Sequence, residues 1–68
     1  MEIHQICPTF SVGDAIGNEM IQIRKVLLEW GYISNVYAID IDPRLAHMAK
    51  PYTVLSRISK DAILFYHY

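Results

Sequence analysis

The sequence predicts an α/β fold, a βαβαβ unit with a three-stranded parallel sheet and helices on both faces. Three short runs rich in β-branched and aromatic residues, at 2–7, 32–40 and 61–68, are the predicted strands. Helical segments separate them, and strands joined through helices run parallel in one sheet. Residues 1–68 are therefore expected to form one domain.

The first connection, residues 15–30, has the spacing of an amphipathic helix. Its apolar residues recur at intervals of 4, 3, 4 and 3, at Ile16, Met20, Ile23, Leu27 and Trp30. Asp14 is the expected N-cap, and Gly31 is the expected left-handed residue that ends the helix. We expect Met20 and Trp30 to lie in the core.

The first strand is expected to end at Pro8, whose nitrogen cannot donate to a sheet. The second predicted strand, 32–40, lacks clean alternation, which is typical of a strand covered on both faces. No helix follows the third strand within the 68 residues. That strand is therefore expected to be poorly covered and both sheet edges open, which indicates an incomplete unit.

The second connection begins with a helix-start signal. Asp42 is a candidate cap and Pro43 suits the first helical position, so a short helix is expected to run to about Lys50. Pro51 would end it. The following residues, 52–59, allow no more than one or two helical turns.

Composition narrows the possible functions. Hydrophobic residues make up 53% of the chain, more than a 68-residue core can bury, so some apolar surface is expected to bind other chains. The single cysteine, Cys7, excludes an internal disulfide and is expected to be inert in a buried strand. The net charge is −1 and the basic residues are scattered, so we predict no nucleic-acid partner. No apolar run is long enough for a membrane span, and the start lacks signal-peptide features, which favours the cytoplasm.

The loop before the first helix carries the segment GDAIGN, residues 13–18. Gly13 and Gly17 would let the backbone approach an anion at the helix start, with Asp14 and Asn18 beside them. The spacing G-x-x-x-G matches neither the dinucleotide nor the P-loop fingerprint. The alternative is structural: Gly13 makes the turn, Gly17 permits close packing and Asp14 caps. Both interpretations stay open.

Other polar residues are expected at the same edge, the carboxyl ends of the strands. Asp40 lies about where an acid would bind ribose hydroxyls, but a turn explains it better, and capping explains Asp42. His67 would bond a sugar or phosphate, or act as a base, unless it is an ordinary strand residue. His4 and His47 are expected to be structural. No nucleophile–base–acid set and no metal-ligand spacing is present, so we predict no catalytic residue, metal or cofactor.

Four segments follow one another in a characteristic order: GDAIGN, LLEWGY at the end of the helix, DPR after the second strand, and YHY at the end of the third. In this order the chain resembles the amino-terminal Rossmann-like domain of retaining GT-B glycosyltransferases, the family of glycogen- and sucrose-synthase-like enzymes. The resemblance covers essentially all 68 residues.

The resemblance implies an acceptor-side domain of a larger enzyme. Gly13, Asp14, Gly17 and Asn18 would lie near a sugar or nucleotide-sugar ligand, with His67 as a further candidate. The family holds its donor mainly in a second domain, which these residues do not contain. The resemblance therefore implies the front of a longer chain, without independent catalysis.

Two other hypotheses compete with this one. The chain would be a stand-alone module whose exposed apolar surface and open sheet edges form a homo-oligomer. Alternatively, it would be a minimal nucleotide- or methyl-donor-binding domain that uses the glycine loop and Asp40. The missing fingerprint makes this last hypothesis the weakest.

Overall fold

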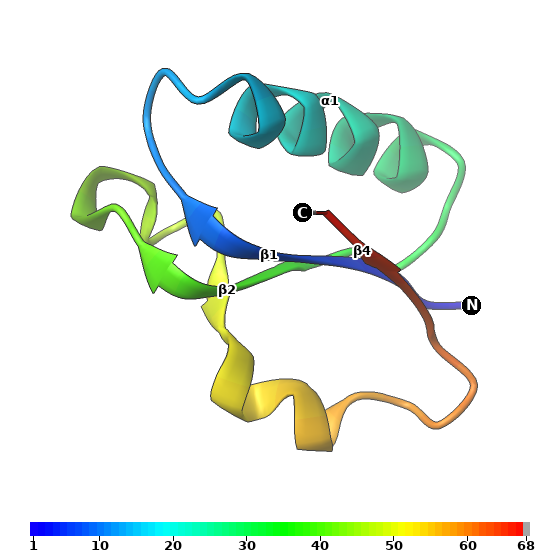
Figure 1. Ribbon diagram of the computed structural model, residues 1–68. Coiled ribbons are helices and arrows are strands. Elements are labelled where there is room, and N and C mark those ends of the chain that lie inside the picture. The colour runs from blue at the N-terminus through cyan, green and yellow to red at the C-terminus, as the bar shows by residue number, and fades with distance from the viewer. Residues whose placement is uncertain (68) are drawn as a thin grey trace.

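A computed structural model describes residues 1–67 and confirms the α/β class with an all-parallel sheet. The sheet has four strands in the order β3-β2-β1-β4. These are β1 (Ile3–Phe10), β2 (Val36–Ile41), β3 (Lys50–Pro51) and β4 (Ile63–Tyr66). The helix α1 (Ala15–Glu29) covers one face, and the 3-10 segment η2 (Tyr52–Arg57) passes beneath the other (Figure 1).

The strand β1 is the centre of the sheet. It pairs with β2 on one side, with Gln5 opposite Val36, and with β4 on the other, with Gln5 opposite Phe65. The carboxyl ends of β1 and β2 therefore meet at one edge, with Phe10 opposite Ile41, whereas β4 ends at Tyr66, opposite Ile6 in the middle of β1.

Helix α1 has the caps that the sequence predicts, and its limits agree with the predicted range to within one residue. The Asp14 carboxylate accepts a hydrogen bond from the Ile16 N–H at 2.8 Å, and Gly31 adopts a φ of 88° just past the helix end. A left-handed residue at this position is the usual helix stop, and glycine takes it without a steric cost. The local sequence signals and the fold agree here.

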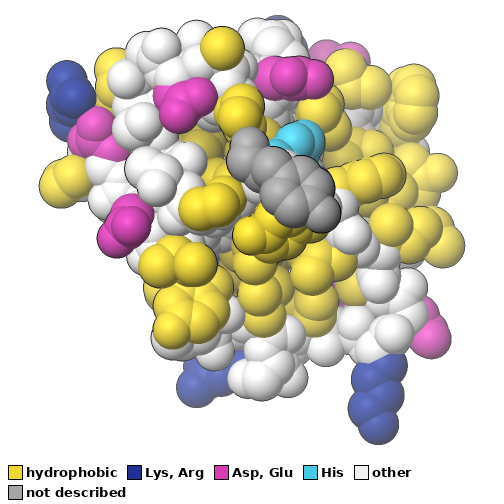
Figure 2. All heavy atoms as spheres, viewed as in Figure 1, with side chains coloured by type: hydrophobic (Ala, Val, Ile, Leu, Met, Phe, Trp, Pro, Cys, Tyr) yellow, Lys and Arg dark blue, Asp and Glu magenta, His cyan; other side chains and the backbone are white. Residues whose placement is uncertain are grey.

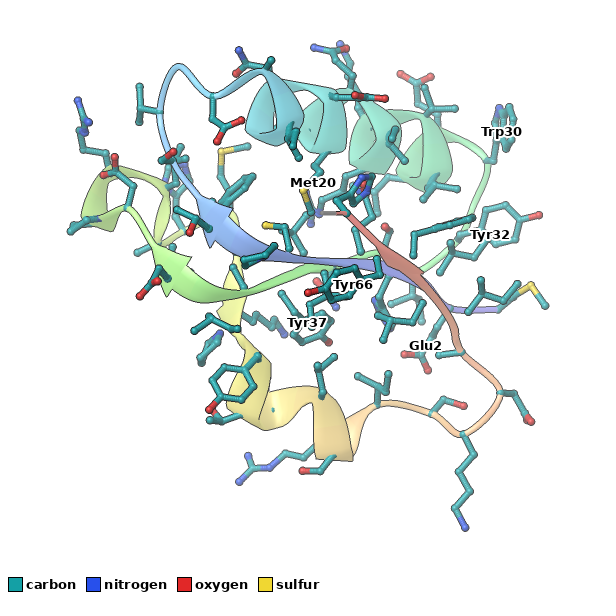
Figure 3. The ribbon with its side chains drawn as sticks, in the orientation of Figure 1. Glu2, Met20, Trp30, Tyr32, Tyr37 and Tyr66 are labelled. Atoms are coloured by element: carbon teal, nitrogen blue, oxygen red, sulfur yellow. The ribbon has the colours of Figure 1, made fainter. Side chains whose placement is uncertain are left out.

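The core lies between α1 and the sheet. Its buried side chains are those of Cys7, Phe10, Met20, Val36 and Ala38. Figure 3 shows Met20 reaching down from the helix toward the strands. The prediction for Trp30 is wrong: it is 71% exposed, because it follows the last helical residue and points away from the sheet at that end (Figure 3).

The prediction that β1 ends at Pro8 is also wrong, since the strand continues to Phe10. The N–H groups of Ile3 and Gln5 bond to the β2 side, whereas Glu2 and Ile6 bond to the β4 side through their carbonyls. Alternation therefore turns the nitrogen of Pro8 toward β4, beyond the last paired residue of that strand. The missing donor costs no ladder hydrogen bond there.

The second connection differs from the prediction. Asp42 caps and Pro43 starts a helical turn as expected, but the turn, η1 (Pro43–Leu45), is a single 3-10 turn. The chain then forms β3, which pairs with Tyr37 and Ala38 of β2. This two-residue strand raises the strand count from three to four. Pairing with β2 replaces the helix predicted up to Lys50.

Strand limits also shift at the other two strands. The strand β2 starts at Val36 rather than at residue 32, because the residues before it make only an isolated bridge between Ile33 and Glu2. The third predicted strand is β4, and Tyr68 lies outside the described residues. All four residues of β4 are exposed, which agrees with the expectation of a poorly covered strand.

Candidate functional site

The loop between β1 and α1 makes its turn at Gly13, which has a φ of 79°. A Cβ placed there would contact nothing within 4 Å, so the left-handed backbone is what favours glycine at this position. The residue is exposed at the carboxyl edge of the sheet. Gly13 therefore has a structural role and is also accessible to a ligand.

Asp14 and Asn18 form the first turn of α1. The Asn18 N–H bonds to the Asp14 carbonyl at 3.0 Å, and the Asn18 side chain is exposed. Because the Asp14 carboxylate already accepts from the Ile16 N–H, a negative charge occupies the helix start. A helix start attracts phosphate through free N–H groups and its positive dipole, and a carboxylate opposes that attraction. The site favours neutral hydroxyl groups over phosphate.

Gly17 lies where α1 packs closely against the end of β1. A Cβ there would lie 3.1 Å from the Ser11 carbonyl oxygen and 3.7 Å from the Phe10 ring. Gly17 is buried, so any contribution to a ligand site would be indirect. The structure thus favours the packing interpretation of this glycine.

His67 is attached to the centre of the fold through Gln5. The Gln5 side chain is fully buried: its Nε2 donates to the Met20 carbonyl at 3.0 Å, and its Oε1 lies 3.0 Å from His67 Nε2. Since Gln5 Oε1 can only accept, His67 Nε2 carries the proton and donates. One buried side chain thereby links α1, β1 and the end of β4. The remaining ring nitrogen, Nδ1, is the one suited to accept from a ligand.

The loop after β2 lies against the loop after β1. Hydrogen bonds from the side chain and backbone of Arg44, together with a weaker one from the Val12 backbone, lower the pKa of Asp42 from 3.8 to about 2. The Asp42 carboxylate accepts from Arg44 Nη2 at 2.9 Å. Asp40 is exposed. Asp42 is therefore occupied in shaping its own turn, as the capping interpretation predicted.

Replacing Arg44 with methionine should raise the pKa of Asp42 from about 2 toward its ordinary value of 3.8. The guanidinium supplies the largest of the interactions that favour the carboxylate, although the backbone N–H groups remain. Since the folded pKa is the lower one, this carboxylate stabilises the fold fully above pH 3.8, and the stabilisation is lost as the pH falls through about 2. Carboxyl ¹³C NMR titration measures the shift. Arg57→Met is the matched control, and an unchanged pKa in Arg44→Met would refute the assignment.

The remaining histidines and the cysteine have structural environments. The Asn35 N–H donates to His4 Nδ1 at 3.0 Å, so His4 Nε2 carries the proton and donates to Glu2 at 2.9 Å. Burial, and secondarily the charge of Asp14, raises the pKa of the Cys7 thiol, which makes it a poor nucleophile. His47 is exposed in the turn after η1. Within residues 1–67, no group of three His, Cys, Asp or Glu side chains is arranged to hold a metal ion.

The structure brings three of the predicted site residues to one edge of the sheet and leaves His67 apart from them. Gly13, Asp14 and Asn18 follow β1, whereas His67 follows β4, whose last residue pairs with Ile6, four residues before the end of β1, so the expectation that His67 lies near the first loop is wrong. The sequence analysis did not predict a role for Gln5, the residue whose side chain links His67 to helix α1 by hydrogen bonds. The signal that could have identified Gln5 is its place as a polar residue inside a buried strand, because a buried amide needs hydrogen-bond partners.

Comparisons of the chain with protein-family models, with curated proteins and with solved structures found no match. None of the helices in the described part of the chain is long and apolar enough to cross a membrane.

Proposed function

We propose that this chain is the amino-terminal part of the acceptor-side, Rossmann-like domain of a GT-B glycosyltransferase, without catalysis of its own and located in the cytoplasm. The observation that carries the proposal is the arrangement of the family-like segments. GDAIGN follows β1, DPR follows β2, and Tyr66, which begins the YHY segment, is the last residue of β4. These three strands are neighbours in a parallel sheet. Ligands of such sheets bind beyond the carboxyl ends of the strands.

The chemistry of this edge supports a sugar acceptor rather than a nucleotide. The Asp14 carboxylate and the Asn18 amide suit hydroxyl groups, whereas the carboxylate at the helix start disfavours a phosphate. The same argument weighs against a nucleotide- or methyl-donor-binding domain. His67 lies beside the middle of β1 and is not part of this edge.

Titration of the ¹⁵N-labelled chain with maltose, a neutral disaccharide, tests the proposal. We expect millimolar binding, with shifts in the amide signals of Gly13, Asp14 and Asn18, and no turnover of UDP-glucose. Asp14→Asn should weaken maltose binding about fivefold, because a neutral acceptor forms weaker hydrogen bonds, while the helix cap is preserved. Asp61→Asn, an exposed acid before β4, is the control. Turnover of UDP-glucose by these 68 residues would overturn the proposal, as would equal maltose binding by Asp14→Asn and the unchanged chain.

The exposure of β4 favours a second candidate, a self-associating module. The β4 residues are between 43% and 54% exposed although all four are large and apolar: Ile63, Leu64, Phe65 and Tyr66. Figure 2 shows hydrophobic side chains gathered over the part of the surface where β4 lies. The occupant would be a second copy of the chain, added at this edge of the sheet, since an edge strand is a template for a further strand.

The α1 helix extends the same apolar surface. Its Ile21 and Leu28 lie on the β2 side, with Val36 and Met48. The opposite flank, which carries Ile23 and Trp30, therefore lies on the β4 side. This flank of α1, with Ile23 and Trp30, offers a second copy further apolar contact on the β4 side.

Sedimentation equilibrium at increasing protein concentration tests this second candidate. We expect a dimer at micromolar concentration, and Phe65→Lys should return it to a monomer because a charge would be buried in the contact. Tyr52→Lys, an equally exposed aromatic position on η2, should leave the dimer intact. A monomer at every concentration would exclude self-association.

A further inference from the structure

A cavity of about 370 Å³ lies between the sheet and η2, away from the glycine loop. On the sheet side the cavity is lined by Tyr37 of β2, and on the η2 side by Val54. Pro51 and Ile58, at either end of η2, also line the cavity. Figure 3 shows Tyr37 and Glu2 on the face of the sheet that looks toward η2. The volume is within the range of small-molecule sites, which begins at about 300 Å³.

The cavity results from the short strand β3. Because β3 pairs with β2 through only two residues and ends at Pro51, the chain leaves the sheet early and runs beneath it as η2. The side chains of η2 are not buried, and Val54 is only half-buried. The chain therefore leaves the space between η2 and the sheet only partly filled, although the Tyr37 side chain itself is 3% exposed.

The cavity carries two cations against one carboxylate. Lys50 and Arg57 line it and are exposed, and neither forms an ion pair with any described residue. The carboxylate belongs to Glu2, whose Oε1 is already 2.9 Å from the donating His4 Nε2. The lining thus combines the apolar residues Pro51, Val54 and Ile58 with positive charge that has no ion-pair partner among the described residues.

We propose that this cavity binds a small molecule that carries an anionic group, a phosphate or carboxylate, on a flat apolar ring. The ring packs against Pro51 and Val54, and the anion meets Lys50 and Arg57. Asn35 also lines the cavity and supplies a further polar contact. The site is at the amino-terminal half of the strands, so it is separate from the sugar site proposed above and does not depend on it.

Phenyl phosphate is a suitable probe, with inorganic phosphate and benzyl alcohol as the ring-free and charge-free comparators. In a ¹⁵N NMR titration we expect phenyl phosphate to shift the amide signals of Asn35, Tyr37, Val54 and Ile58 at millimolar concentration. Each comparator should bind more weakly. Arg57→Gln and Lys50→Gln should each weaken phenyl phosphate binding about three- to fivefold, as expected for an exposed ion pair.

The controls are Arg44→Gln and Lys60→Gln, two exposed cations outside the cavity lining. Neither should change the affinity for phenyl phosphate. All four substituted side chains are exposed, so the variants are expected to keep the fold, which their amide spectra verify. Binding of inorganic phosphate as tight as that of phenyl phosphate, equal weakening by the control variants, or shifts confined to residues outside the cavity would each overturn the proposal.

Discussion

Truncation of Phe10 to alanine should abolish the fold at room temperature. The Phe10 ring is 0% exposed and packs in the core with Met20 and Val36. Loss of a buried phenylalanine side chain costs about 3–5 kcal/mol, because apolar burial is lost and a cavity remains. In a chain of this length a single hydrophobic core rarely supplies more than about 3–5 kcal/mol, so the loss is most or all of it.

Urea unfolding followed by far-UV circular dichroism measures this effect. Tyr52→Ala removes an aromatic side chain from an exposed position on η2 and should change the free energy of unfolding by less than about 1 kcal/mol. If Phe10→Ala unfolds at the same urea concentration as Tyr52→Ala, the core described for this chain is wrong.

The second large effect is expected from Gly17→Val. A Cβ at this position lies only 3.1 Å from the Ser11 carbonyl oxygen, which belongs to the backbone, and the Phe10 ring is close behind it. The two further methyl groups of valine would push α1 away from β1. Overpacking of this kind costs about 1–3 kcal/mol, more than the helix gains by losing a glycine.

Asn18→Val is the matched control, because it places the same side chain at the next, exposed position of the helix. Its free energy of unfolding should stay within about 1 kcal/mol of the unchanged chain. Equal unfolding midpoints for Gly17→Val and Asn18→Val would mean that Gly17 does not hold the helix against the sheet, and would return it to the list of ligand-binding candidates.

Local signals predicted the elements whose ends depend on nearby residues. The sequence predicts three such features correctly: the Asp14 cap, the Gly31 helix stop and the Asp42–Pro43 turn. Capping and left-handed turns can be predicted because they involve residues within one helical turn. Helix α1 therefore has its predicted limits to within one residue.

Features that depend on pairing between strands far apart in the sequence could not be predicted. The continuation of β1 past Pro8 depends on where β4 stops, and the two-residue strand β3 exists only because β2 lies beside it. The exposure of Trp30 depends on where α1 ends relative to the sheet (Figure 3). None of these three features can be predicted from a short stretch of neighbouring residues.

The candidate site divides in the same way. The parallel order of the strands predicts that Gly13, Asp14 and Asn18 lie at the carboxyl edge of the sheet, and they do. The same argument placed His67 there, but β4 ends opposite Ile6, short of that edge. The bond from Gln5 to His67 spans 62 residues of sequence, and the cavity under Tyr37 depends on the path of η2. Both required the three-dimensional arrangement.

The most direct test of the glycosyltransferase proposal is the mass of the intact polypeptide that carries the peptide VLLEWGYISNVYAIDIDPR in its source cells, determined by top-down mass spectrometry. The proposal predicts a chain several times longer than 68 residues, on which sugar transfer should then be assayed. An intact species of 7.9 kDa would contradict it and would leave self-association through β4 as the function to pursue.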